Sequence, residues 1–271
     1  MTQAIVIGVY RFLGFHIANS ILSKGNSLIG VEWLDRQVED VEEKKSFFIR
    51  NSNYTFWDNH TVLEEKEPIL LVINMYDFIM YREWREVEQR DILNKIKSFV
   101  ANLSEKNVRV MLFVPEKMDP SIKEEIEQCI EQLIPKAITQ WIYLPELYGP
   151  WMSSAAPLQQ LFSSKDKKFL ALNRCIYIDD FIAQWELLME LETEIVSIQK
   201  ERQENWQDDL IRFFQLEETE ALSGDVIDVM EVTEHCIEIP TGTNLYEGLQ
   251  NMEQHRKQLD FMRIFSDQHL D

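Results

Sequence analysis

The sequence predicts an α/β protein: a doubly wound parallel sheet with a smaller C-terminal α/β lobe. Three observations predict this class. Short apolar runs typical of fully buried strands recur along the first half of the chain, segments with helical periodicity separate them, and the pattern changes near residue 150. We therefore expect a sheet domain over residues 1–150 and a smaller lobe over residues 151–271, in which a segment of about residues 170–200 returns to the sheet.

The chain begins with a strand, a helix and a second strand in about thirty residues, the size of one such unit. Residues 4–8 form an apolar run that ends in glycine, residues 15–24 have helical periodicity, and residues 27–32 form the second run. Gly25 and Asn26 follow the helix, where residues of these types commonly end it. We expect the crossover to be right-handed and the two strands to be parallel.

The same alternation continues to residue 144. Apolar runs predict further strands, and periodic segments predict the helices between them. The expected strands cover residues 53–57, 68–74, 108–114 and 137–144, and the expected helices cover residues 82–104 and 121–134. In the smaller lobe we expect helices over residues 179–192, 201–214 and 245–259, and short strands over residues 225–231 and 236–239.

Charge and composition exclude several classes of partner and site. The chain has 27 Lys and Arg residues against 47 Asp and Glu residues, and the net charge of −20 repels nucleic acids and anionic membranes. No apolar stretch approaches the ~20 residues that span a bilayer. The N-terminus has none of the features of a signal peptide, so we expect a cytoplasmic protein. The Cys and His residues lack metal-ligand spacing, so no metal site is predicted.

The turn after the first strand is a candidate phosphate-binding site. It begins at Gly8 and ends at Gly14, and glycines in such a turn let backbone amides and a helix N-terminus approach a pyrophosphate. Glu32 ends the second strand, where an acid accepts hydrogen bonds from an adenosine ribose. The alternative is a tight strand-to-helix turn that binds no ligand.

Four segments resemble the extended short-chain dehydrogenase/reductase family, the NAD-dependent epimerase/dehydratase group. Residues 8–16 are similar to that family's Gly-x-x-Gly-Phe-Ile-Gly-x-His turn, and residues 144–150 to its Arg-Pro-x-x-Val-Tyr-Gly-Pro segment. Residues 177–180 resemble its Tyr-Val-Asp-Asp helix opening, and residues 246–249 its C-terminal Glu-Glu-Gly-Leu helix. The matches follow the family's order and span nearly the whole chain.

The resemblance implies a Rossmann-like domain that holds NAD(P) and a smaller lobe over a substrate. The expected cofactor-binding residues are Gly8, Arg11, Phe12, Leu13, Gly14, Glu32 and Asn74, the last of which ends the predicted strand 68–74. The resemblance also implies a homodimer formed through the helices at residues 82–104 and 121–134. The alternative for these amphipathic helices is packing on their own sheet.

The residues that perform the family's oxidoreductase step are missing. That step uses a Tyr-x-x-x-Lys pair, because a nearby ammonium lowers the pKa of the tyrosine. None of the eight tyrosines is followed by lysine four positions later. Lys123 matches the lysine position, but Asp119 stands where the tyrosine should be, and the segment of residues 114–117 after the preceding strand has no hydroxyl side chain.

The cofactor turn is altered as well, because Arg11 replaces the middle glycine of the motif. Its side chain either crowds the phosphates or turns outward and pairs with them, as arginine does well. Glu32 would repel a 2′-phosphate, so the sequence favours NAD over NADP.

We interpret the chain as a divergent NAD(P)-binding protein of the epimerase/dehydratase type without oxidoreductase catalysis. It would act as a nucleotide-sensing or protein-binding subunit that has either kept NAD as a ligand or lost it. One alternative is an active NAD-dependent reductase, epimerase or dehydratase on a small-molecule or nucleotide-sugar substrate, with Asp119, Lys123 or Tyr76 as substitute catalytic residues. The other is a purely structural assembly factor.

Overall fold

A computed structural model describes residues 3–32, 39–57, 69–80, 86–101, 103, 107–133, 137–163, 175–200, 206–214 and 235–267. The chain divides into two compact units. The first contains Met1–Leu144, Leu187–Ile198 and Met230–Ile237, and the second contains Pro145–Glu186, Gln199–Val229 and Glu238–Asp271. Among the described residues, no helix is long and apolar enough to cross a membrane.

The first unit is built on an eight-stranded sheet with the order β10-β9-β6-β5-β4-β1-β2-β3. From β9 to β3 in this order, each pair of neighbouring strands is parallel. The sequence order reverses between β1 and β4, as it does in doubly wound sheets. The strands are β1 (Gln3–Ile7), β2 (Leu28–Val31), β3 (Tyr54–Phe56), β4 (Ile69–Asn74), β5 (Val108–Pro115), β6 (Ile138–Leu144), β9 (Ile195–Lys200) and β10 (Cys236–Ile239).

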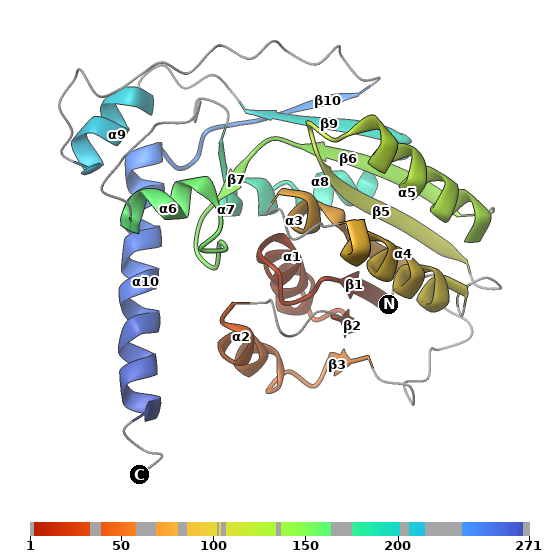
Figure 1. Cartoon of the computed structure of the whole chain (residues 1–271), viewed down its shortest axis with the longest axis horizontal. Coiled ribbons are helices and arrows are strands. Elements are labelled where there is room, and N and C mark those ends of the chain that lie inside the picture. The colour runs from red at the N-terminus through yellow and green to blue at the C-terminus, as the bar shows by residue number, and fades with distance from the viewer. Residues whose placement is uncertain are drawn as a thin grey trace. The chain divides into compact units, whose positions relative to one another are not determined.

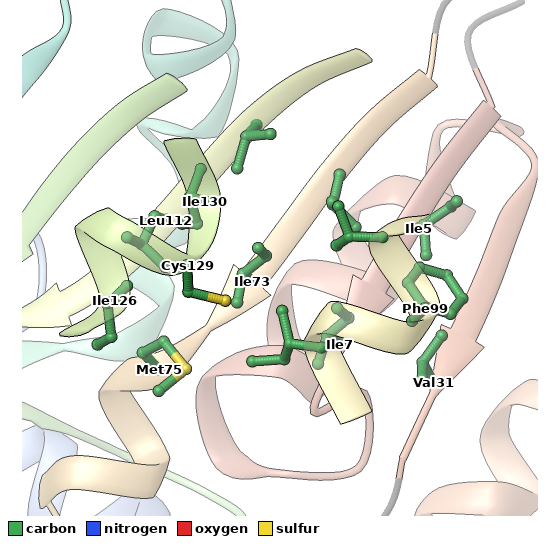
Figure 2. Packing of buried hydrophobic residues seen from close by; sticks show 14 of the residues in the cluster. Ile5, Ile7, Val31, Ile73, Met75, Phe99, Leu112, Ile126, Cys129 and Ile130 are labelled. Carbon is green, nitrogen blue, oxygen red and sulfur yellow. The ribbon is translucent and has the colours of Figure 1, made fainter. Parts of the chain in front are cut away.

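The central strands are apolar on both faces because helices cover both sides of a parallel sheet. On one face, α4 (Glu86–Ala101) and α5 (Pro120–Leu133) lie along the strands (Figure 1). Figure 2 shows Phe99 of α4 and Cys129 of α5 packed over alternate strand residues, among them Ile7 and Ile73. The helix α1 (Phe12–Ser23) connects β1 to β2, and this step along the sheet runs in the opposite direction to the steps from β4 to β5 and from β5 to β6. Because crossovers between parallel strands are right-handed, α1 lies on the other face of the sheet from α4 and α5.

The end of α1 matches the expectation from the sequence. Gly25 has a φ of +74°, which glycine adopts without the steric cost of a side chain. Its N–H donates to the carbonyl of Leu22 at 3.0 Å, and the N–H of Asn26 donates to Ile21 at 3.3 Å. These bonds satisfy carbonyls that the last turn of a helix would otherwise leave without donors.

In the second unit, three of the segments that resemble the short-chain dehydrogenase family pack together. Strands β7 (Leu147–Tyr148) and β8 (Ile176–Tyr177) pair in parallel, and their two tyrosine rings lie 5.4 Å apart. A Cβ at Gly248 would lie 2.7 Å from the hydroxyl of Tyr148, so the third segment needs its glycine for this contact. The helices of this unit are α6 (Pro157–Ser163), α7 (Ile178–Ile182), α9 (Trp206–Phe214) and α10 (Leu245–Asp267).

Several expectations need correction. Residues 179–192 form two short helices, α7 and α8 (Trp185–Glu190), rather than one. The sequence analysis missed the strand β9, whose alternate residues are buried, and the helices α2 (Val41–Phe48), α3 (Met75–Met80) and α6. The expected strand at residues 225–231 lies outside the described residues, as do residues 82–85, 102, 104, 134 and 201–205 of the expected helices.

Candidate functional site

The turn between β1 and α1 depends on both of its glycines. Gly8 has a φ of +77°, and its N–H donates to the carbonyl of Val31 at 2.8 Å. A Cβ at Gly14 would overlap the carbonyl oxygen of Gly8, so α1 approaches the end of β1 this closely only because residue 14 has no side chain. Helix α1 begins at Phe12, with Arg11 at its N-cap.

This turn lies at the carboxyl ends of β1 and β4, where the strand order reverses. Ligands of doubly wound sheets bind at such a position. Asn74 is the last residue of β4 and is fully buried, and Glu32 directly follows β2 with 7% of its surface exposed. The fold therefore brings Glu32 and Asn74 to the same end of the sheet as Gly8, as the sequence predicted.

The side chain of Arg11 turns into the site. It is 5% exposed, and its guanidinium lies 4.0 Å above the ring centroid of Phe78 in α3. Its Nε lies 3.5 Å from Oε1 of Glu32, within ion-pair distance. A Cβ at Gly8 would lie 3.4 Å from Cδ of Arg11, so the arginine stem packs directly against the turn.

The carboxylate of Asp77, a residue of α3, lies at the N-terminal end of α1. Its Oδ2 accepts hydrogen bonds from the backbone N–H of Leu13 at 2.8 Å and from Nδ2 of Asn74 at 2.6 Å. Leu13 is the second residue of α1, so its amide has no acceptor within the helix and points out of its N-terminal end. Asp77 is 1% exposed, and burial raises its pKa to about 6, although these two hydrogen bonds and the charges of Arg11 and Lys44 act in the opposite direction.

Lys44 of α2 adds a second buried cation. It is 3% exposed, and its Nζ donates to the carbonyl of Glu39 at 3.1 Å. Burial lowers its pKa to about 8, while the charges of Asp40, Asp77, Glu39 and Glu32 oppose this change. We call Arg11, Glu32, Lys44 and Asp77 the first-turn charge cluster: two cations and two carboxylates, each no more than 7% exposed.

Solved structures provide a comparison for this arrangement. The NAD-dependent NDP-hexosamine 5,6-dehydratase TunA, involved in tunicamycin biosynthesis, matches with a TM-score of 0.59 and 12% identity over 94% of this chain and 97% of that chain. The dTDP-glucose 4,6-dehydratase (rfbB) from Bacillus anthracis str. Ames, in complex with NAD, matches with a TM-score of 0.57 and 10% identity over 95% and 97%. A UDP-galactose 4-epimerase matches with a TM-score of 0.55 and 10% identity over 95% and 99%.

This chain has the extended short-chain dehydrogenase/reductase fold. No protein-family model matches its sequence, and no curated protein matches it either. The likeness is therefore one of structure over nearly the full length of both chains.

The residues at this turn do not fit a dinucleotide as they are arranged here. A pyrophosphate in a doubly wound fold accepts hydrogen bonds from amides at the N-terminus of the first helix. The Leu13 amide already donates to Asp77, and Glu32 lies in an ion pair with Arg11. A phosphate brought to this amide would meet the buried carboxylate of Asp77, and like charges at such a distance repel strongly away from water.

The three candidate catalytic residues, Asp119, Lys123 and Tyr76, have different surroundings. Asp119 is exposed and caps α5, because its Oδ1 accepts hydrogen bonds from the N–H and the hydroxyl of Ser121 at 2.8 and 2.6 Å. These bonds lower its pKa. Lys123 lies one turn further, 3.7 Å from Glu127 and 5.7 Å above the ring of Tyr143. Tyr76 is fully buried in α3.

Sequence reasoning missed three members of the site: Lys44, Asp77 and Phe78. Asp77 had one local signal, an acid three residues after the asparagine that ends β4, in the first turn of a helix. Its contact with Leu13 joins residues 64 positions apart and follows only from the pairing of β1 with β4. Tyr143 was missed as a neighbour of Lys123 for the same reason, since it lies on β6.

Proposed function

We propose that this chain is a non-catalytic protein on the extended short-chain dehydrogenase/reductase fold, and that it acts as a protein-binding subunit. One observation carries the proposal: the carboxylate of Asp77 sits on the Leu13 amide, at the place where the fold would hold a pyrophosphate. A protein that oxidises or reduces a substrate through NAD must leave this amide open to the cofactor.

The charge balance of the first-turn charge cluster supports the same proposal. Its two carboxylates, Glu32 and Asp77, match the charges of Arg11 and Lys44 inside the protein. A dinucleotide would add two phosphate charges to a cluster that is already neutral. Because interactions between buried charges are poorly screened, this addition would cost much more than it would at a surface.

One observation favours the alternative of an active enzyme. Lys123 and Tyr143 form a contact between an ammonium and a phenol, and this contact raises the pKa of Lys123. A catalytic tyrosine must reach its substrate, however, and Tyr143 is 5% exposed and belongs to the buried apolar cluster of the sheet, which also contains Ile126 and Val114. We therefore assign this tyrosine to packing.

Titration calorimetry with NAD, NADP and a nucleotide sugar tests the proposal. We expect no binding heat for the wild-type chain and no nicotinamide absorbance in the purified protein. Binding of NAD without turnover would support the nucleotide-sensing alternative instead. Turnover that Tyr143→Phe abolishes would contradict the proposal and identify the chain as an enzyme.

The proposal also includes a protein partner, and the resemblance to the short-chain dehydrogenase/reductase family implies a second copy of the chain as one. Association of two copies through α4 and α5 stays a prediction from the family resemblance. Sedimentation equilibrium on the purified chain measures this association directly. A different partner should co-purify from the native host in a fixed ratio to the chain, and a chain that is monomeric and recovers no such partner would contradict a protein-binding role.

A further inference from the structure

We infer that Asp77 is a built-in occupant of an anion subsite, and that removing its carboxylate opens this subsite to the diphosphate of a nucleotide. The inference rests on the proposed function and deepens it. The proposal states that the wild-type chain does not bind a dinucleotide, and the inference states which group excludes it.

The first step of the argument is the position of the acceptor. Helix α1 has 12 residues, and the Leu13 amide donates out of its N-terminal end to Oδ2 of Asp77 at 2.8 Å. Amides at this end of a helix bind phosphate because they donate hydrogen bonds and carry the positive end of the helix dipole. A carboxylate oxygen is an acceptor of the same kind, so Asp77 makes the contact that a phosphate oxygen would make.

The second step is that the site is built for a bound anion rather than for a surface carboxylate. Asp77 is 1% exposed, and its Oδ1 has no hydrogen-bond donor among the described residues. Nδ2 of Asn74 donates to the same Oδ2 at 2.6 Å. The subsite thus has a backbone donor and an amide side chain, both directed at one acceptor that comes from a neighbouring element, α3.

The third step is the charge that remains when Asp77 is removed. Arg11 and Lys44 are both buried, and both act on the carboxyl of Asp77 as positive charges. Without Asp77, the cluster keeps both cations and loses one of its two carboxylates, while Asp40 and Glu39 continue to act on Lys44. The subsite then repels an added anion less, and two hydrogen-bond donors remain beside the Arg11 guanidinium, an arrangement that suits phosphate.

The fourth step is space. The Arg11 stem lies against Gly8, where the side chain of Phe78 also packs. The loss of the Asp77 carboxylate makes room at the amide, and the loss of the Arg11 side chain makes room over the glycine turn. The two substitutions therefore open different parts of the site: Asp77→Ala opens the helix amide to a diphosphate, and the added Arg11→Gly opens the glycine turn but removes one of the two buried cations.

The test measures binding of inorganic pyrophosphate, ADP and NAD by calorimetry to five forms of the full chain. These are the wild type, Asp77→Ala, Asp77→Asn, the double variant Arg11→Gly/Asp77→Ala, and the control Asp180→Ala. Asp180 is matched to Asp77 because its carboxylate also accepts a backbone hydrogen bond, from Thr243 at 3.0 Å, but it lies in the second unit. Circular dichroism and thermal unfolding establish that each form is folded.

We expect Asp77→Ala to bind pyrophosphate and ADP roughly tenfold or more tightly than the wild type, at one site per chain, which corresponds to at least about 1.4 kcal/mol. Asp180→Ala should behave as the wild type. Asp77→Asn keeps the size of the side chain and removes its charge, so it should gain a smaller part of this affinity. If Asp77→Ala does not fold, Asp77→Asn tests the contribution of the charge alone, and an affinity for pyrophosphate no higher than that of the wild type would overturn the inference.

A folded Asp77 variant that binds none of the three probes more tightly than the wild type would overturn the inference, and the proposed function would stand. A gain of equal size in Asp180→Ala would overturn it too, because the effect would then follow from total charge. Tight binding of NAD to the wild type is a different result, because it would contradict the proposed function itself.

Discussion

The substitution Asp77→Asn should change how the stability of this protein depends on pH. Burial raises the pKa of Asp77 from its ordinary 3.8 to about 6, so the folded chain holds this proton more tightly than the unfolded chain. Stability therefore falls as pH rises through this range, and the full loss corresponds to about 3 kcal/mol. About half of this loss of stability occurs between pH 5 and pH 7.5, because at pH 5 the carboxyl is already mostly deprotonated in the unfolded chain.

Asparagine keeps the oxygen that accepts from Leu13 and has no charge to bury. The free energy of unfolding of Asp77→Asn, relative to wild type, should therefore increase by about 1.5 kcal/mol from pH 5 to pH 7.5. Urea unfolding followed by tryptophan fluorescence at several pH values gives this difference. A difference between the two proteins that stays constant with pH would refute the reasoning, because the Asp77 carboxyl would then be as accessible to water as in the unfolded chain.

Three further predictions test the surroundings of the site and the sheet. Gly14→Ala should lower the free energy of unfolding by about 3 kcal/mol or more, because the new Cβ would overlap the Gly8 carbonyl. Gly25→Ala should lower it by only about 1–2 kcal/mol, because residue 25 has open space around it and only its φ of +74° is unfavourable. Equal melting temperatures of the two variants would contradict this prediction. Burial lowers the pKa of Lys44 to about 8, so between pH 8 and pH 10.5 the unfolded chain holds the Lys44 proton more tightly than the folded chain does. The free energy of unfolding of the wild type should therefore rise by roughly 3 kcal/mol over this range. Urea unfolding of Lys44→Met should lack this rise, and a rise that persists would show that another group causes it. Arg109→Met should lower the free energy of unfolding by roughly 1–3 kcal/mol, because the guanidinium donates to carbonyls at the end of α8; an unchanged denaturation midpoint would contradict that role.

The central sheet was predictable because its signals are local. The run at β4 consists of six buried residues, and Gly25 ends α1 by a conformation that its residue type favours. Such patterns depend on neighbours within a few positions, and they gave the strands from β1 to β6. The helix α3 was missed because it is only six residues long and directly continues the strand β4.

The contents of the site were less predictable than its place. Gly8 and Gly14 marked the turn, and Arg11 was recognised as either blocking it or lining it. The choice between these outcomes depends on Phe78 and Glu32, which the sheet brings to Arg11 from two other elements. Asp77 is the strongest example, since nothing near Leu13 in the sequence indicates which acceptor its amide will find.

A crystal structure of the wild-type protein grown with NAD at millimolar concentration tests the central claim most directly. We predict that Oδ2 of Asp77 lies within hydrogen-bond distance of the Leu13 amide, with the Arg11 guanidinium over Phe78 and beside Glu32. Electron density for a pyrophosphate on the Leu13 amide, with Asp77 turned away, would contradict the claim.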